Sequence, residues 1–192
     1  MTVNESEMTL VIRAYAFAAW KHRGQKRKGG RGEPYINHCI DVTERLWVTG
    51  GVRDINIITA AILHDTVEDT DATRDEIAHE FGDTVARIVM EVTDDTTKPS
   101  IERKRLQVEH ANELSIEARH LKIADKLSNV HDIIASPPRG WTVNRCQQYV
   151  QWAEDVIGEI RGTNSALEND FDETAAKARE KLRDRNMCDE SE

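Results

Sequence analysis

Residues 57–63, IITAAIL, restrict how this chain can fold more than any other stretch. Six of these seven residues are apolar, and a helix that is apolar on nearly all sides is normally buried among other elements. The next eight residues, HDTVEDTD (64–71), bring one histidine and four carboxylates. Because the C-terminal end of a helix carries a partial negative charge, acids are disfavoured there. The acids at this buried helix end therefore indicate a bound cation.

Apolar residues recur with helical spacing along the chain, and no stretch shows the sustained alternation of a β-strand. Start signals such as Thr73 with Glu76, Ser115 and Thr142, and stop signals such as Gly82, divide the sequence into helices. With 192 residues, the chain has the length of a single domain that can bury a substantial core. We expect one all-α domain with helices at about 6–22, 34–47, 54–66, 73–82, 83–95, 100–114, 115–136, 142–160 and 164–185.

Composition excludes several classes of protein. The net charge of −9 disfavours nucleic-acid binding through a basic surface. No apolar run approaches the ~20 residues of a membrane span, and the first ten residues lack a secretory signal. The cysteines are odd in number and far apart, at positions 39, 146 and 188. We therefore expect reduced thiols and a cytoplasmic location, without membrane or nucleic-acid partners.

Positive charge is concentrated in one segment, KHRGQKRKGGR (21–31), which holds six Lys/Arg and no acid. Such a run is compatible with an ordinary solvated loop. On an otherwise acidic protein it is also suited to line a site for a small polyphosphate. The sequence alone leaves both interpretations open.

Four side chains at the end of the buried helix are candidates for metal chemistry. Residues four apart share a helix face, so that His64 lies over Glu68 and Asp65 over Asp69. Imidazole with carboxylate suits Mn²⁺, Fe²⁺ or Zn²⁺. A solvated helix end with no metal remains the alternative for a lone His-Asp pair.

Two further segments add candidates. His38 lies near the start of an apolar helix, directly after the basic segment, where a packed or capping histidine is the alternative. In LKIADKLSNVHDII (121–134), one helical stripe is polar and the opposite stripe is apolar. The polar stripe is compatible with a site or with the wet face of an amphipathic helix, and it consists of Lys122, Asp125, Asn129 and Asp132.

Several motifs in the same order resemble the HD superfamily of metal-dependent phosphohydrolases, and more closely the hydrolase domain of RelA/SpoT-type alarmone enzymes. Over about residues 10–165 the chain is similar to the small stand-alone hydrolases, the metazoan SpoT-homologue type. The motifs are FAAWKHRGQKRK, EPYINH, AAILHDTVEDT, FGDTVARIVMEVTDD, ERKRLQ and KIADKLSNV. The resemblance implies an HD-type helical bundle over 1–187, with its core at about 6–162 and a frayed tail at 188–192.

The resemblance also implies roles for individual residues. It assigns one Mn²⁺ ion per active site to the ligands His38, His64, Asp65 and Asp125. It assigns the activation of water to Glu68 and Asp69. It assigns contacts with phosphate, sugar or base to Arg27, Lys28, Asn129, Arg145 and Tyr149.

The chain departs from the family pattern at three places. Cys39 stands where the family usually has proline after the ligand histidine. The basic segment carries extra glycines at 29, 30 and 32, which affect the placement of Lys28. Ser100 stands where related small hydrolases can offer lysine, and Lys98 or Arg103 is available to replace it.

The function implied is 3′-pyrophosphohydrolysis of guanosine 3′,5′-bis(diphosphate) (ppGpp) or its pentaphosphate, which releases pyrophosphate and GDP or GTP. One alternative is an HD phosphohydrolase for a 5′-nucleotide, a dNTP or a dinucleotide with a ribose 2′- or 3′-phosphate. A second is a non-catalytic nucleotide-binding helical module. The expected partner is a small guanine nucleotide, and the oligomeric state is left open.

Overall fold

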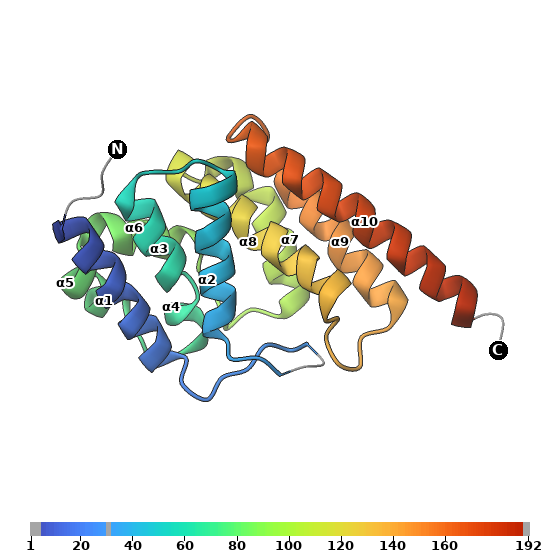
Figure 1. Cartoon of the computed structure of the whole chain (residues 1–192), viewed down its shortest axis with the longest axis horizontal. Helices are drawn as coiled ribbons and strands as arrows, with labels where there is room; N and C mark the ends of the chain where they lie inside the picture. Colours follow the sequence, from blue (N-terminus) through green and yellow to red (C-terminus); the bar gives the residue numbers. More distant parts are fainter. Residues whose placement is uncertain (1–4, 30–31, 190–192) are drawn as a thin grey trace.

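The computed structural model describes residues 5–29 and 32–189, and this part of the chain is all-α, as predicted (Figure 1). Its only β-type pairings are isolated bridges, one of which joins Gly29 to Pro138. The first half contains α1 Glu5–Lys21, α2 Ile36–Glu44, the π-helical turn η1 Arg45–Thr49, α3 Ile55–Leu63, α4 Thr66–Asp69, α5 Arg74–Phe81 and α6 Asp83–Val92. The second half contains α7 Ser100–Glu109, the 3₁₀ turn η2 Ala111–Glu113, α8 Ile116–Ala135, α9 Val143–Gly158 and α10 Ser165–Asp189.

Three helix starts that the sequence predicted are confirmed as N-caps. The capping side chain accepts a hydrogen bond from the backbone N–H three residues later, which satisfies one of the otherwise unpaired donors of the first turn. The pairs are Thr73 with Glu76, Ser115 with Ala118, and Thr142 with Arg145.

The predicted helix over 54–66 is wrong at its end. Helix α3 ends at Leu63, and Asp65 lies at φ −95° and ψ −3° before α4 begins. The Thr66 hydroxyl donates a hydrogen bond of 2.6 Å to the Leu63 carbonyl oxygen. A side chain that competes for backbone groups in this way interrupts a helix. The His64-Asp65 pair therefore lies in a turn between two helices.

The predicted helix over 34–47 is also displaced. Helix α2 begins at Ile36 and continues into η1, which ends at Thr49 before Gly50 and Gly51. The last helix is longer than expected, because α10 continues to Asp189. Residues 190–192 of the expected tail lie outside the described part of the chain.

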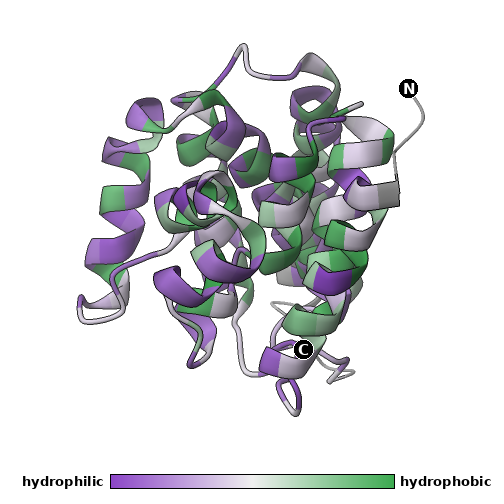
Figure 2. Cartoon of the chain, turned by 90° about the vertical axis from the view of Figure 1, so that its left-hand side faces the viewer, coloured by the Kyte–Doolittle hydropathy of each residue, from purple (hydrophilic) through white to green (hydrophobic). Residues whose placement is uncertain are grey.

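Helix α3 lies at the centre of the fold, as its composition demands. Its residues from Ile57 to Leu63 are all buried, and helices α1, α2, α6 and α8 pack around it. Apolar and polar residues occupy different faces of the surrounding helices (Figure 2). Helix α8 is the second structural centre, because it contacts α2, α3 and α6 as well as α9 and α10. The end of α3 and the middle of α8 are thereby held inside one rigid core.

The basic segment forms a loop between α1 and α2 that reaches the α8–α9 connection (Figure 1). The Lys28 carbonyl accepts a hydrogen bond of 3.0 Å from the Arg139 N–H. A Cβ atom on Gly29 would lie 2.6 Å from Ser136 Oγ and 2.7 Å from the Ser136 carbonyl oxygen. Glycine at 29 therefore permits the contact that fixes Lys28. Gly30 and Arg31 of this segment lie outside the described residues.

Within the described residues, none of the helices combines the length and the apolar character that crossing a membrane requires.

Candidate active site

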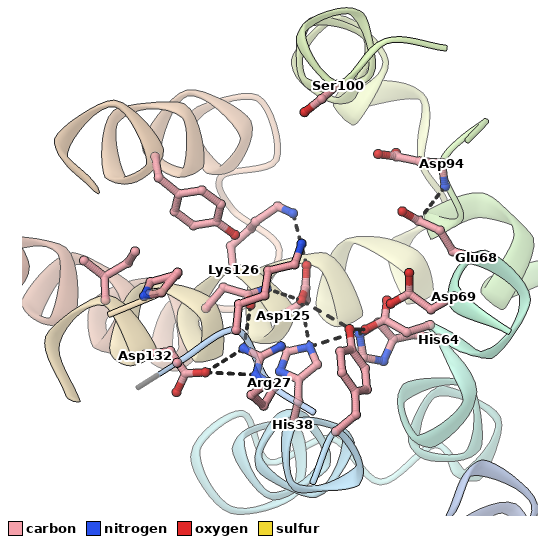
Figure 3. A pocket seen from close by; sticks show the side chains of 18 of the residues that line it. Arg27, His38, His64, Glu68, Asp69, Asp94, Ser100, Asp125, Lys126 and Asp132 are labelled. Atoms are coloured by element: carbon pink, nitrogen blue, oxygen red, sulfur yellow. Dashed lines mark hydrogen bonds and ion pairs between the residues drawn. The ribbon is translucent and has the colours of Figure 1, made fainter. Parts of the chain in front are cut away.

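Two histidines and two aspartates converge at the end of the buried helix α3, and Figure 3 labels His38, His64 and Asp125 among them. His38 comes from α2, His64 and Asp65 from the turn after α3, and Asp125 from α8. Asp125 Oδ1 lies 3.2 Å from His38 Nε2 and 3.8 Å from His64 Nε2. Asp65 Oδ2 lies 3.6 Å and 3.1 Å from the same two nitrogens. Four donor atoms therefore face one small volume.

The outer nitrogens of both histidines are already engaged. His64 Nδ1 donates to the Ala61 carbonyl oxygen at 2.8 Å, and His38 Nδ1 lies 3.0 Å from Ser128 Oγ. Because a carbonyl only accepts hydrogen bonds, the proton of a neutral His64 lies on Nδ1 and leaves a lone pair on Nε2. This is the arrangement of metal-binding histidines, whose second nitrogen is held by an outer partner.

The charge around His64 favours a cation. Burial lowers the pKa of His64, but the charges of Asp65 and Asp125 raise it to about 9. Burial lowers the pKa of His38, although the hydrogen bond with Asp125 acts to raise it. Burial alone would raise the pKa of Asp65, yet the charge of His64 holds it well below its usual range. Two ionised aspartates are thus enclosed with two imidazoles, and a positive charge between them is strongly stabilised.

These donors fit a divalent metal ion. His38, His64 and Asp65 each offer one ligand atom within 4.8 Å of the others, and Asp125 contacts both histidines. His64 Nε2 is buried and has no hydrogen-bond partner among the described residues, as expected for an atom reserved for a ligand. Imidazole and carboxylate together suit borderline divalent ions. The cluster therefore has the chemistry of a divalent-metal site.

Glu68 and Asp69 lie beside this cluster (Figure 3). Glu68 Oε2 accepts a hydrogen bond of 2.9 Å from the Asp94 N–H, and Glu68 Oε1 accepts one of 3.1 Å from Arg103. Burial raises the pKa of Glu68, and the negative charge of Asp94, Asp65 and Asp69 acts in the same direction. Partial desolvation and the charge of Asp65 raise the pKa of Asp69. Both carboxyl groups are consequently better proton acceptors than exposed ones.

The metal cluster opens into a cavity of about 580 Å³, within the range of small-molecule sites. Eight Lys/Arg and six Asp/Glu line it, whereas the whole chain has 26 and 35. The cavity is therefore cationic in an acidic protein, before any metal ion is counted. All eleven predicted site residues line it, and their individual roles stay predictions: Arg27, Lys28, His38, His64, Asp65, Glu68, Asp69, Asp125, Asn129, Arg145 and Tyr149.

The predicted substrate contacts differ in how they are held. Arg27 donates hydrogen bonds to Asp132 Oδ2 at 2.6 Å and to Asn129 Oδ1 at 2.9 Å. It is therefore fixed against α8, whereas the side chain of Lys28 is exposed, and its ammonium group makes no hydrogen bond with a described residue. The Arg145 guanidinium lies 4.4 Å from the centre of the Trp141 ring. Tyr149 lies next to Trp141, with 5.6 Å between ring centres.

The sequence did not single out two residues that contact the metal cluster. Tyr35 Oη donates a hydrogen bond of 2.5 Å to Asp65 Oδ2. Lys126 is buried, and its Nζ lies 3.1 Å from Asp125 Oδ2. Tyr35 therefore holds one oxygen of Asp65, and Lys126 holds one oxygen of Asp125. Both residues lie in motifs of the resemblance, Tyr35 in EPYINH and Lys126 in KIADKLSNV. The contact of Tyr35 with Asp65 had no further signal, because the two residues are distant in sequence.

The structure separates the two basic residues that the sequence offered near Ser100. Ser100 and Arg103 line the cavity, and Lys98 does not. Lys98 instead lies 3.9 Å from Asp95 and borders a smaller neighbouring cavity. Arg103 is the residue that reaches the site, where its guanidinium contacts Glu68.

Comparison with known proteins agrees with this geometry. Residues 14–151 match the family model described as HD domain. The guanosine-3′,5′-bis(diphosphate) 3′-pyrophosphohydrolase MESH1 of Xenopus tropicalis is 49% identical over 167 residues, which are 87% of this chain and 93% of that protein. The Homo sapiens MESH1 is 50% identical over 163 residues, 85% of this chain and 91% of that protein.

A solved structure, described as a metazoan orthologue of SpoT that hydrolyses ppGpp and plays a role in starvation responses, superposes with a TM-score of 0.87. It shares 41% sequence identity, and the match covers 92% of this chain and 98% of that one. Fold and site together define a helical protein with a candidate metal centre in a cationic cavity. The chain belongs to the HD domain family and, within it, groups with the MESH1 proteins.

Proposed function

We propose that this protein is a guanosine 3′,5′-bis(diphosphate) 3′-pyrophosphohydrolase, which converts ppGpp to GDP and pppGpp to GTP with release of pyrophosphate. One observation carries the proposal. A single cavity joins a cluster of two histidines and two aspartates, an adjacent pair of carboxyl groups with raised pKa, and an excess of cationic side chains. Its relatives named for this activity align over nearly their whole length.

We propose Mn²⁺ as the ion, with His38, His64, Asp65 and Asp125 as its protein ligands. The mixture of imidazole and carboxylate donors, without thiolate, supports an ion of intermediate softness. When bound, such an ion lowers the pKa of water and neutralises charge on phosphate oxygens. Tyr35 holds Oδ2 of Asp65, the oxygen that faces the two histidines, and Lys126 holds Oδ2 of Asp125, whose Oδ1 faces them; both contacts orient the aspartates.

Glu68 is the proposed general base. Each carboxylate oxygen has two acceptor positions, and each oxygen of Glu68 accepts one hydrogen bond from the protein. One position per oxygen is thus left to accept a proton from water, and the two protein donors fix the direction in which it points. Asp69, on the same helix α4, assists by orienting that water. Proton transfer of this kind contributes roughly 10²–10⁴-fold to the rate.

The reaction balances with water as the only co-reactant. Water attacks the phosphorus attached to the ribose 3′-oxygen and gives up one proton to Glu68. The bond from phosphorus to the 3′-oxygen breaks, and the 3′-oxygen takes up a proton. Arg27, Lys28 and Arg145 are proposed to bind phosphate oxygens of the substrate, and Arg27 and Lys28 to stabilise the charge that develops on the 3′-phosphate. The free and buried Cys39 and Cys146 support the expectation of a reducing, cytoplasmic environment.

The test is a nucleotide panel with the full chain in Mn²⁺, assayed separately for pyrophosphate and for inorganic phosphate. We expect pyrophosphate from ppGpp and pppGpp only, and no turnover after chelation of the metal. Glu68→Gln is expected to lower turnover at least 100-fold while the helical circular dichroism and bound metal stay unchanged. Asp75→Asn, at an exposed acid on α5, serves as the control and should be fully active.

Three results would contradict the proposal in different ways. Inorganic phosphate from a ribose 2′- or 3′-phosphorylated dinucleotide, without hydrolysis of ppGpp, would indicate another HD phosphohydrolase. Binding of guanine nucleotide with no product from any member of the panel would indicate a non-catalytic module. Near-normal turnover by Glu68→Gln would remove the base from the mechanism.

A further inference from the structure

Helix α7 forms one side of the cavity and presents a single polar stripe to it. The cavity-lining residues of this helix are Ser100, Arg103, Lys104 and Gln107, which have the spacing of one helix face. Arg103 is engaged with Glu68, and the Gln107 amide donates to both carboxylate oxygens of Asp94. Lys104 is the exception, because its ammonium group makes no ion pair or hydrogen bond with a described residue. One cation of this stripe is therefore left for a ligand.

Aromatic rings hold the Lys104 ammonium group in place. It lies 5.1 Å from the centre of the Tyr149 ring and 4.8 Å from that of the Trp152 ring. The indole N–H of Trp152 donates a hydrogen bond of 2.9 Å to the Lys104 carbonyl oxygen, so the ring is tied to α7. An ammonium group that is fixed against ring faces keeps its charge but gains no neutralising acid.

The charges near Lys104 are unbalanced. Lys126 lies 4.4 Å from the centre of the same Trp152 ring, and its acid partner is Asp125, in the metal cluster. Burial lowers the pKa of the half-buried Lys104, and the charges of Lys126 and Arg145 lower it further. No acid is among these neighbours. An anion that entered here would relieve the repulsion between three cations.

Free cations thus occur at two places in the cavity. Lys28, in the basic segment, lies near enough to Asp69, beside the metal cluster, for its charge to lower the pKa of that carboxyl group. Lys104 and Arg145 lie at the aromatic wall formed by Trp141, Tyr149 and Trp152. The proposed substrate also has two anionic ends, since one ribose carries a diphosphate at its 3′-oxygen and another at its 5′-oxygen.

We propose that Lys104, together with Arg145, binds the 5′-diphosphate of the substrate and thereby selects nucleotides that carry 5′-phosphates, an inference that rests on the proposed function. The 3′-diphosphate lies at the metal cluster, where Glu68 is positioned. The aromatic wall holds both cations, Arg145 against Trp141 and Lys104 against Tyr149 and Trp152. Lys104 is in this assignment a specificity-determining residue that takes no part in bond cleavage.

The experiment compares Lys104→Met with the wild type on two substrates, ppGpp and guanosine 3′-diphosphate, whose 5′-hydroxyl carries no phosphate. We expect KM for ppGpp to rise about tenfold, because a charge-assisted contact is lost, with kcat within twofold. KM for guanosine 3′-diphosphate should stay within twofold. Lys104→Arg should retain most of the affinity for ppGpp. Lys177→Met, at an exposed lysine of α10, is the control for loss of a lysine charge.

Calorimetry keeps this inference separate from the proposed function. GDP and guanosine are titrated into the metal-free wild type and Lys104→Met, and we expect the variant to lose affinity for GDP alone. If the wild type hydrolyses neither nucleotide, the proposed function fails, and the GDP titration still tests the anion site. Equal effects of Lys104→Met on both substrates, or unchanged affinity for GDP, would overturn the inference.

Discussion

Arg103 and Glu68 join two separate helices across the cavity, with 3.1 Å between Arg103 Nη1 and Glu68 Oε1. The second carboxylate oxygen of Glu68 is held by the Asp94 N–H, and Arg103 also lies 3.7 Å from Asp94 Oδ2. The carboxylate is therefore fixed from both sides. Arg103 has the geometry of a positioning residue for the proposed base.

Arg103→Ala is expected to lower kcat roughly 10–100-fold with little change in KM for ppGpp. The reason is that a carboxylate free to rotate is misplaced for proton transfer, and small misplacements are costly. Steady-state kinetics of Arg103→Ala, Arg103→Lys and Arg105→Ala check this, and lysine should restore part of the loss. Arg105 is on the same helix but is exposed and paired with Glu109. If Arg103→Ala behaves like Arg105→Ala, the positioning role is wrong.

Tyr35→Phe should weaken Mn²⁺ binding about 10–100-fold. Phenylalanine keeps the ring contacts with His22 and His38 but loses the hydrogen bond to Asp65, and outer partners of metal ligands affect affinity by this amount. Titration calorimetry of Mn²⁺ into metal-free protein measures the change. Tyr15→Phe is the control, since it removes a tyrosine hydroxyl near Thr43. Equal affinity in the two variants would exclude an orienting role for Tyr35.

Metal binding should stabilise the folded chain. At a free Mn²⁺ concentration of 100 times Kd, the free energy of unfolding is expected to rise by about 2.7 kcal/mol. His64→Ala should abolish this increment, because it removes a donor that is buried inside the cluster. Urea unfolding with Mn²⁺ and with chelator, for both proteins, gives the comparison. An equal increment in His64→Ala would place the ion elsewhere.

Lys122 should make stability depend on pH in alkaline solution. Burial and the charge of Lys126 lower the pKa of Lys122 from its ordinary value of 10.5 to about 8. Between these values the unfolded chain retains a proton that the folded chain has released, so the free energy of unfolding rises with pH, by up to about 1.4 kcal/mol per unit. Lys122→Met should remove that slope between pH 8 and 10. Denaturant unfolding across this range, with identical slopes for both proteins, would contradict the assignment.

Replacement of glycine by alanine should change the free energy of unfolding in opposite directions at Gly50 and at Gly158. A Cβ atom at Gly50 would lie 2.9 Å from two side-chain carbons of Leu167, so Gly50→Ala should destabilise the fold by about 1–3 kcal/mol through overpacking. Gly158 is at the end of α9 with nothing within 4 Å of such an atom. Gly158→Ala should stabilise by about 0.5–1 kcal/mol, because alanine is the better helix residue. Urea unfolding of both variants checks the signs.

The all-α fold and the helix starts followed from local signals. Thr73, Ser115 and Thr142 act on backbone groups three residues away, and a sequence contains that information. The turn at His64 and Asp65 did not follow, because the Thr66 hydroxyl competes with the backbone for the Leu63 carbonyl. Periodicity does not report such competition.

The sequence predicted the site residues that lie in recognisable motifs. It did not predict which other side chains point into the cavity, because this depends on the orientation of the segments around it. The resemblance assigned His38, His64 and Asp125 to one metal site, and in the structure their donor atoms lie close to one another. Arg103 enters the cavity because of how α7 is turned about its axis, whereas Lys98 lies before the start of α7, next to Asp95. The rotation of α7 is set by long-range contacts such as Trp152 with the Lys104 carbonyl.

The four donors come from α2, from the turn after α3 and from α8, and Asp125 is the last of them to be translated. A nascent chain that has just passed residue 100 already carries both histidines, yet it has no α8 to enclose them and no fourth donor. With the four donors as the proposed ligands, such a chain lacks the complete metal site while it is still on the ribosome. The site forms only when α8 has joined the helices made before it.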